Sequence, residues 1–164
     1  MSAAEGSWLR AERSLIIDAP PAACLAVLLD VERHPEWQAH LQRVTVIERD
    51  DRDRPARAIL EGRVGERDLT LAVTYRYPSA NRVALELSGS DFGDLRGQWS
   101  FRAVSGGRSR AQLVLEARPS WALRLLMRGP AYENIRDQVL GHLLDDFAAR
   151  LNPRRPGEPP SSRR

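Results

Sequence analysis

The sequence predicts an α+β domain in which a curved antiparallel sheet of seven strands wraps around one long C-terminal helix. Seven segments have the length and the residue types of strands. The last six of them follow one another across short, turn-forming breaks, which is typical of antiparallel neighbours. One long amphipathic stretch near the C-terminus is predicted to be a helix. The apolar face of this helix can cover the apolar face of the sheet.

The first strand is expected to lead into two short helices. The strand, about Leu9–Ile17, ends in IIDAPP, where Pro20 and Pro21 suit the first turn of a helix because N–H groups there have no intrahelical partner. AACLAVLLD then forms a short amphipathic helix. Its apolar face consists of Cys24, Leu25, Leu28 and Leu29. HPEWQAH, residues 34–40, follows as a second short helix or turn that Pro35 interrupts.

Six further strands are expected in succession. Their ranges are Leu41–Glu48, Ala56–Val64, Asp68–Tyr77, Arg82–Ser88, Asp94–Val104 and Ser109–Ala117. The breaks between them read DDRDRP, GER, PSAN, GSDFG and SGG, and they contain the residue types that hairpin loops require. Loops this short predict a meander in which consecutive strands are neighbours.

The stretch from Arg118 to Leu151 is predicted to be helical, with a break or kink at Gly129 and Pro130. Its apolar residues recur at three- and four-residue spacing, namely Leu125, Tyr132, Ile135, Val139, Leu143 and Phe147. This helix should lie across the concave face of the sheet. The curved sheet cannot pack tightly against the helix along the whole length of the helix. We therefore expect a cavity between them, in one domain of residues 8–151 followed by a disordered Pro/Arg-rich tail at 152–164.

The composition excludes several classes of function. All 25 basic residues are arginines, so a P-loop lysine and a lysine Schiff base are both excluded. The net charge is only +3 and no sustained basic stripe exists to follow a nucleic acid. A lone cysteine forms no intramolecular disulfide, and no apolar run approaches the roughly 20 residues that span a bilayer. We expect a cytoplasmic protein with neither a nucleic-acid partner nor stable membrane insertion, as a monomer or a homodimer.

Residues 16–50, IIDAPPAACLAVLLDVERHPEWQAHLQRVTVIERD, resemble the START-like, or helix-grip, superfamily (SRPBCC), particularly its polyketide cyclase/dehydrase and coenzyme-Q-binding branch. The positions that carry the resemblance are Asp18, Ala19, Pro20, Asp30, Glu32, Pro35 and Trp37. Residues 97–117, GQWSFRAVSGGRSRAQLVLEA, also look like the sixth and seventh strands of that family. The resemblance covers about residues 8–151 and implies the helix-grip fold, which hosts carriers, cyclases, hydrolases and binding proteins alike.

Period-two alternation predicts an apolar and aromatic concave face, which suits a flat or long hydrophobic ligand. The residues that we expect to contact the ligand are Trp37, Thr74, Tyr77, Leu85, Leu87, Phe92, Trp99, Phe101, Tyr132 and Ile135.

Two expectations disagree at Arg76. VTYRYP resembles an aromatase/cyclase strand whose serine and arginine point into the pocket, which implies pocket positions for Thr74 and Arg76. Alternation instead places Arg76 on the outer face, unless a β-bulge shifts the phase.

These observations predict a protein that binds a hydrophobic ligand or a polyketide intermediate, most concretely as a polyketide cyclase/dehydratase-like protein. Its cavity would fold a poly-β-ketone, and Arg76, Tyr75 or His34 would assist enolisation or dehydration. A non-enzymatic carrier or sensor of a lipid, quinone or polyketide stays open as the alternative, because few polar residues face inward. No metal or cofactor is expected, since His34, Glu36 and His40 lack the spacing of a zinc helix.

Overall fold

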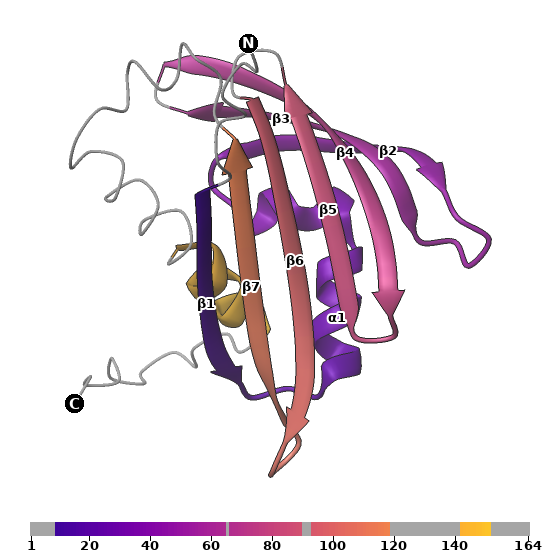
Figure 1. Ribbon diagram of the computed structural model, residues 1–164, viewed down its shortest axis with the longest axis vertical. Coiled ribbons are helices and arrows are strands. Elements are labelled where there is room, and N and C mark those ends of the chain that lie inside the picture. Colours follow the sequence, from indigo (N-terminus) through magenta and orange to yellow (C-terminus); the bar gives the residue numbers. More distant parts are fainter. Residues whose placement is uncertain (1–8, 65, 90–92, 119–141, 152–164) are drawn as a thin grey trace, which may run out of the picture.

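Seven strands form one antiparallel sheet in the order β1-β7-β6-β5-β4-β3-β2 (Figure 1). The computed structural model describes residues 9–64, 66–89, 93–118 and 142–151. The strands are β1 Leu9–Ile17, β2 Leu41–Arg49, β3 Pro55–Val64, β4 Arg67–Ser79, β5 Arg82–Gly89, β6 Gly93–Val104 and β7 Arg108–Arg118. Two short helices, α1 Pro21–Leu29 and the 3₁₀ helix η1 Val31–Glu36, connect β1 to β2, and residues 142–151 are helical.

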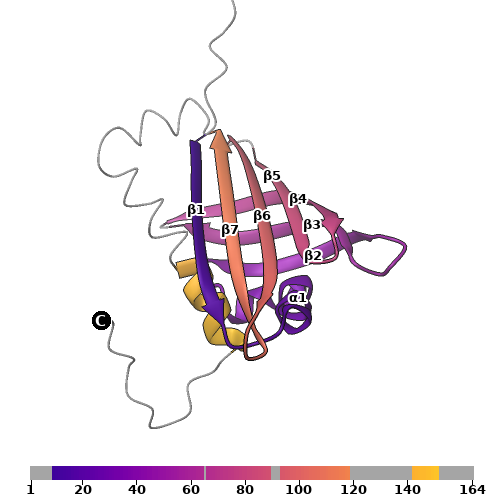
Figure 2. The same ribbon diagram turned by 60° about the horizontal axis from the view of Figure 1, so that its bottom comes forward.

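The predicted fold class is confirmed, and every predicted strand end lies within two residues of the observed one. The sheet curves, and α1 and helix 142–151 lie on its concave side, as Figure 2 shows. This is the helix-grip arrangement. The predicted break at Gly129 and Pro130 and the tail at 152–164 lie outside the described residues, as do the first four residues of the predicted apolar helix face.

Helix α1 begins as the two prolines predict. Pro20 is its N-cap and Pro21 its first residue, and the Pro20 carbonyl accepts hydrogen bonds from the N–H groups of Ala23 and Cys24. Cys24 is completely buried, and the Ser109 hydroxyl donates a 2.6 Å hydrogen bond to the Ala19 carbonyl. This bond fixes the chain between β1 and α1 to the start of β7.

The connection from η1 into β2 depends on a glycine. The Arg63 N–H donates a 2.9 Å hydrogen bond to the His40 carbonyl, which brings this turn directly against β3. At Gly62 an added Cβ would lie only 2.2 Å from the same carbonyl oxygen. A residue without a side chain is therefore required at Gly62 for the chain to enter β2 at this place.

Candidate functional site

Alternation along the strands gives the two faces of the sheet different chemistry. On β4, Val73 and Tyr75 are buried, whereas Arg76 is exposed. On β6, Trp99 is buried and Arg102 is exposed. The apolar set lies on the concave side with the helices and the polar set on the convex side, as the alternation predicts.

Aromatic packing fills one end of the concave face. The ring of Phe147, in helix 142–151, lies with its centroid 4.9 Å from that of Trp99, 5.8 Å from that of Phe101 and 5.6 Å from that of Trp37. Trp99 and Phe101 each keep only 2% of their surface exposed. Because Phe147 already covers these two rings, we assign them to the core and not to the ligand surface.

The rest of the concave face carries leucines that keep partial access to solvent. We call Leu85, Leu87, Leu95 and Leu115 the aliphatic patch, and all four are half-buried. They occupy two neighbouring cross-strand rows, because Leu87 lies opposite Leu95, and Gly97 pairs with both Leu85 and Leu115. Two of these leucines, Leu85 and Leu115, lean over Gly97, where an added Cβ would lie 3.2 Å from each. The patch offers a smooth apolar surface to a ligand.

Tyr75 adds a polar group beside the aliphatic patch, because it lies opposite Leu85 in the ladder between β4 and β5. Its side chain is 9% exposed, and its hydroxyl makes no hydrogen bond to any described residue. Within the described chain, no fully buried side-chain oxygen or nitrogen lacks a partner, so this hydroxyl oxygen keeps some access to solvent. Burial raises the pKa of Tyr75, which keeps the group a protonated hydrogen-bond donor at neutral pH.

Tyr77 faces the same side but is already engaged. Its hydroxyl donates a 2.6 Å hydrogen bond to the Pro55 carbonyl, and the guanidinium of Arg54 lies 3.9 Å from the ring centroid. Burial raises the pKa of Tyr77 to about 12, against the opposing effect of the Arg54 charge. Tyr77 therefore holds β4 against the start of β3, and its hydroxyl is not available to a ligand.

His34 is buried in the protein and serves the packing of the two short helices. Its side chain is 8% exposed, its Nε2 lies 2.9 Å from the Leu28 carbonyl oxygen, and its Nδ1 lies 3.5 Å from the Gln38 amide nitrogen. Its ring also packs on Trp37, with centroids 4.8 Å apart. Burial lowers the pKa of His34 to about 4, so the ring is neutral and donates from Nε2 to Leu28. Both nitrogens therefore have partners within the protein, and a role of His34 in chemistry on a ligand stays a prediction.

Arg76 and Thr74 lie on the convex face. The Arg76 side chain is 69% exposed and pairs at 4.0 Å with Glu86 on β5. Thr74 lies in a cross-strand row between Arg57 and Glu86, both of which are exposed. No register shift occurs in β4 before Arg76. The alternation is thus correct at this point, and the pocket positions that the resemblance implied for Arg76 and Thr74 are not observed.

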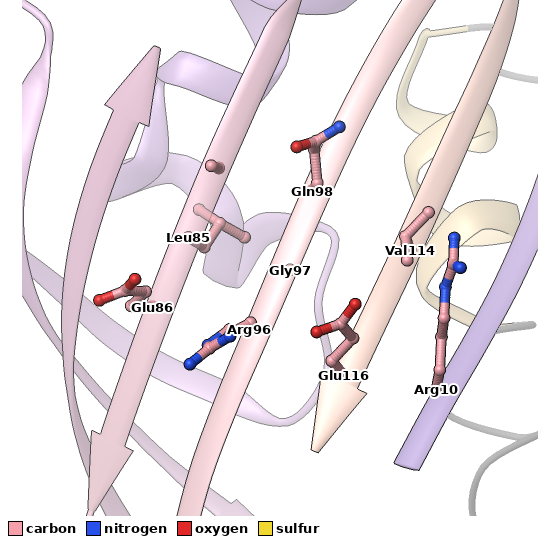
Figure 3. Close-up of a pocket in the computed structure, with 9 residues that line it drawn as sticks. Arg10, Leu85, Glu86, Arg96, Gly97, Gln98, Val114 and Glu116 are labelled. Atoms are coloured by element: carbon pink, nitrogen blue, oxygen red, sulfur yellow. The ribbon is translucent and has the colours of Figure 1, made fainter. Parts of the chain in front are cut away.

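The convex face also carries a shallow depression of about 340 Å³, shown in Figure 3. Arg10, Glu116, Arg96 and Glu86 cross it as one row of directly opposed residues on β1, β7, β6 and β5. Their charges alternate along the row, and cross-strand pairs of opposite charge stabilise a sheet. We therefore interpret this depression as a charge-balanced outer surface.

Several predicted site residues lie outside the described chain, namely Phe92, Tyr132 and Ile135. Conversely, the predicted ligand residues did not include Leu95 and Leu115, although the same alternation that selected Leu85 and Leu87 places them inward. Arg13 was also missed. It lies on the concave side of β1, opposite Leu113, and pairs at 3.8 Å with Asp145 of helix 142–151. The signal was the alternation of Ala11, Arg13 and Leu15 in the first strand.

The described residues contain neither a metal-binding cluster nor a membrane-spanning helix. No group of three or more His, Cys, Asp or Glu side chains there is placed to hold a metal ion. No helix among the same residues is long and apolar enough to cross a bilayer.

The fold and the apolar concave face define the chain as a helix-grip protein. A family model for polyketide cyclase/dehydrase and lipid transport proteins matches residues 17–145, and the chain belongs to this family. Membership in it supports the binding of a hydrophobic ligand. No curated protein sequence matches the chain.

Solved structures with the same fold include a START superfamily protein from Mycobacterium smegmatis, with a TM-score of 0.78 and 16% identity over 88% of this chain and 97% of that one. The Zhui aromatase/cyclase from a Streptomyces species has a TM-score of 0.64 and 16% identity over 89% of this chain and 90% of that one. The di-domain ARO/CYC StfQ of the steffimycin biosynthetic pathway has a TM-score of 0.66 and 16% identity, over 86% of this chain and 44% of that one. At these identities the likeness establishes the fold alone.

Proposed function

We propose that the protein binds a hydrophobic small molecule against the aliphatic patch, with the Tyr75 hydroxyl donating a hydrogen bond to an oxygen of the ligand. The observation that carries this proposal is a hydroxyl that has no hydrogen-bond partner among the described residues and lies beside the half-buried leucines of the aliphatic patch. Sites for small molecules combine a mostly apolar lining with a few polar groups that orient the ligand. Membership in a family of cyclases, dehydrases and lipid-transport proteins supports the same kind of ligand.

The more specific proposal is a polyketide cyclase/dehydratase-like activity on a poly-β-ketone. Tyr75 is the group that we assign to the reacting carbonyl, because a fixed neutral donor in an apolar site stabilises the negative charge that develops on oxygen during enolisation. Folding of the poly-β-ketone against the aliphatic patch would bring the reacting carbons of this substrate together. The aromatase/cyclase fold neighbours support this reading at the level of the fold.

A non-enzymatic carrier is the second candidate, and the chemistry of the described concave residues favours it. His34 has both nitrogens engaged and Arg76 lies on the convex face, so neither supports acid–base chemistry on a bound ligand. The raised pKa keeps Tyr75 protonated at neutral pH, so it is a weak acid and its phenolate is not available as a general base. A carrier needs the apolar surface and the orienting hydroxyl, and it needs no titrating group.

Binding is tested first, by native mass spectrometry of the purified protein and by calorimetry with emodin and decylubiquinone as flat aromatic and prenyl-like probes. Leu85→Trp adds an indole to the aliphatic patch and should abolish binding, whereas Ala84→Trp adds the same ring to the convex face one residue away and should not. If neither probe binds and no ligand co-purifies, the proposal is wrong. If both variants bind as the wild type does, the ligand does not lie on the concave face.

The role of Tyr75 is tested by a matched pair of tyrosines on the same strand. Tyr75→Phe should weaken binding of a carbonyl-bearing probe about threefold to tenfold with little change in stability, since a neutral hydrogen bond contributes about 0.5–1.5 kcal/mol. Tyr77→Phe should lose the bond to Pro55 and destabilise the fold, yet leave binding unchanged. Turnover of a poly-β-ketone by the wild type and not by Tyr75→Phe supports the cyclase, and binding without turnover supports the carrier.

A further inference from the structure

A second groove, of about 620 Å³, lies on the convex face and is separate from the proposed ligand site. It is found at the end of the sheet where the β4–β5 and β6–β7 hairpins turn, at the bottom of Figure 1. We call it the arginine groove, because Arg82, Arg102 and Arg110 line it. Ser14, Ser100 and Gln112 also line the groove, and they add hydroxyl and amide groups.

The strand register brings the three arginines together. Arg102 on β6 lies directly opposite Arg110 on β7, and Arg82 on β5 lies opposite Ser100, two residues from Arg102. Directly opposed residues have Cβ atoms about 4.5–5.5 Å apart and diagonal ones about 7–8 Å, so Arg102 lies between Arg82 and Arg110 with both long side chains as its neighbours. Like charges in direct opposition destabilise a sheet. The pairing of Arg102 with Arg110 thus lowers the stability of the fold, which calls for an explanation.

No carboxylate in the described chain compensates this charge. Glu12 is the acidic residue in the lining of the groove, but its carboxylate already accepts hydrogen bonds from Arg10, at 3.1 Å, and from the Gln112 amide. None of the three groove arginines forms an ion pair with a described acidic residue. Elsewhere on the same face, Arg76 pairs with Glu86 and Arg57 with Glu48. The three arginines thus have no ion-pair partner in the described chain, and the lining as a whole, with three arginines and one glutamate, carries a net charge of +2.

The groove is also held in shape. The Phe101 N–H donates a 3.0 Å hydrogen bond to the Asn81 carbonyl, which fixes the β4–β5 turn beside β6. The Ser100 hydroxyl donates to the Gln112 side-chain oxygen at 3.3 Å, which orients that amide toward Glu12. These bonds set the floor of the groove and leave the guanidinium groups exposed above it.

We propose that the arginine groove binds a phosphorylated small molecule, with its phosphate held by Arg82, Arg102 and Arg110. Guanidinium groups match phosphate oxygens with paired hydrogen bonds. A phosphate monoester carries about −1.5 to −2 charges at neutral pH and so balances the groove, whereas a single carboxylate does not. Hydroxyl and amide groups in the lining suit the polar remainder of such a ligand, and the volume is that of an ordinary small-molecule site.

Calorimetry in a phosphate-free and sulfate-free buffer tests this site with glucose 6-phosphate, inorganic phosphate and acetate as probes. The wild type should bind both phosphates more tightly than acetate. Tighter binding of glucose 6-phosphate than of inorganic phosphate identifies a phosphate ester as the ligand, and equal binding identifies the free anion. Absence of binding by either phosphate at 25 °C, or acetate binding as tightly, overturns the proposal.

Matched variants locate the site. Arg110→Gln should weaken phosphate binding about tenfold or more, because a hydrogen bond to a charged group contributes about 1.5–3 kcal/mol. Arg76→Gln removes the same charge from the same face outside the groove, and should change binding less than twofold. Arg110→Gln should also raise the melting temperature of the unliganded protein by about 1–3 °C, since it relieves the opposition to Arg102. Equal losses in the two variants would overturn the proposal, because they would reflect the net charge alone.

Discussion

His34 makes the stability of the protein depend on pH in a way that the structure predicts in sign and size. Burial lowers the pKa of His34 from 6.5 to about 4. Between pH 6.5 and pH 4, His34 is therefore protonated in the unfolded chain but stays neutral in the folded chain. The contribution of His34 to the free energy of unfolding is therefore fully present above pH 6.5 and is lost as the pH falls toward 4. Below pH 4 both states are protonated, and this residue causes no further loss. A pKa lowered by this amount corresponds to a change of about 3 kcal/mol in the free energy of unfolding.

The assay is urea denaturation of the wild type and of His34→Gln at several pH values between 7.5 and 4. His34→Gln should be less stable at pH 7.5, because it disturbs the contacts with Leu28 and Gln38, but its stability should fall less steeply with acid, by about 3 kcal/mol over the window. His40→Gln removes an exposed histidine and should follow the wild-type curve. Parallel curves for the wild type and His34→Gln would refute the reasoning, as would an NMR titration of His34 with a midpoint near 6.5.

Three further predictions concern the packing. Gly62→Ala should destabilise the fold by about 3 kcal/mol in urea denaturation, because its Cβ would clash with the His40 carbonyl oxygen; a neutral effect would mean that the turn before β2 lies elsewhere. Phe147→Ala should cost about 3–5 kcal/mol and shift the tryptophan fluorescence, since its ring contacts Trp99, and an unchanged spectrum would contradict that contact. The Cys24 thiol should resist a thiol reagent until urea unfolds the chain, because it is completely buried and burial raises its pKa; rapid modification of the native protein would disprove this.

The elements of the fold were predictable because their signals are local. Turn residues separate each pair of strands, and the side chains within a strand alternate with a period of two residues. The start of α1 follows from Pro20 and Pro21, whose geometry suits the first turn of a helix. The curvature and the side on which the helices lie follow next, because an apolar face must be covered.

The site was less predictable, since its chemistry depends on contacts between distant segments. HPEWQAH looks like a cluster of titratable groups, yet the turn of the chain from α1 into η1 brings His34 under the Leu28 carbonyl and makes it a packing residue. Trp99 and Phe101 have the residue types of a ligand surface, but Phe147, more than forty residues further along the chain, covers both. No periodicity within one strand can report such a contact.

Arg76 shows which kind of sequence information is the stronger when two disagree. The resemblance of VTYRYP to an aromatase/cyclase strand compares a few side chains, whereas the alternation of β4 involves every residue from Leu69 to Tyr77. Turning Arg76 inward would require a bulge that also turns Tyr75 or Tyr77 outward, with loss of the burial of Tyr75 or of the hydrogen bond to Pro55. The burial of its neighbours therefore determines on which face this arginine lies. The same constraint holds Tyr75 inward beside Leu85, and for that reason Tyr75 is the residue of this strand that we assign to the ligand.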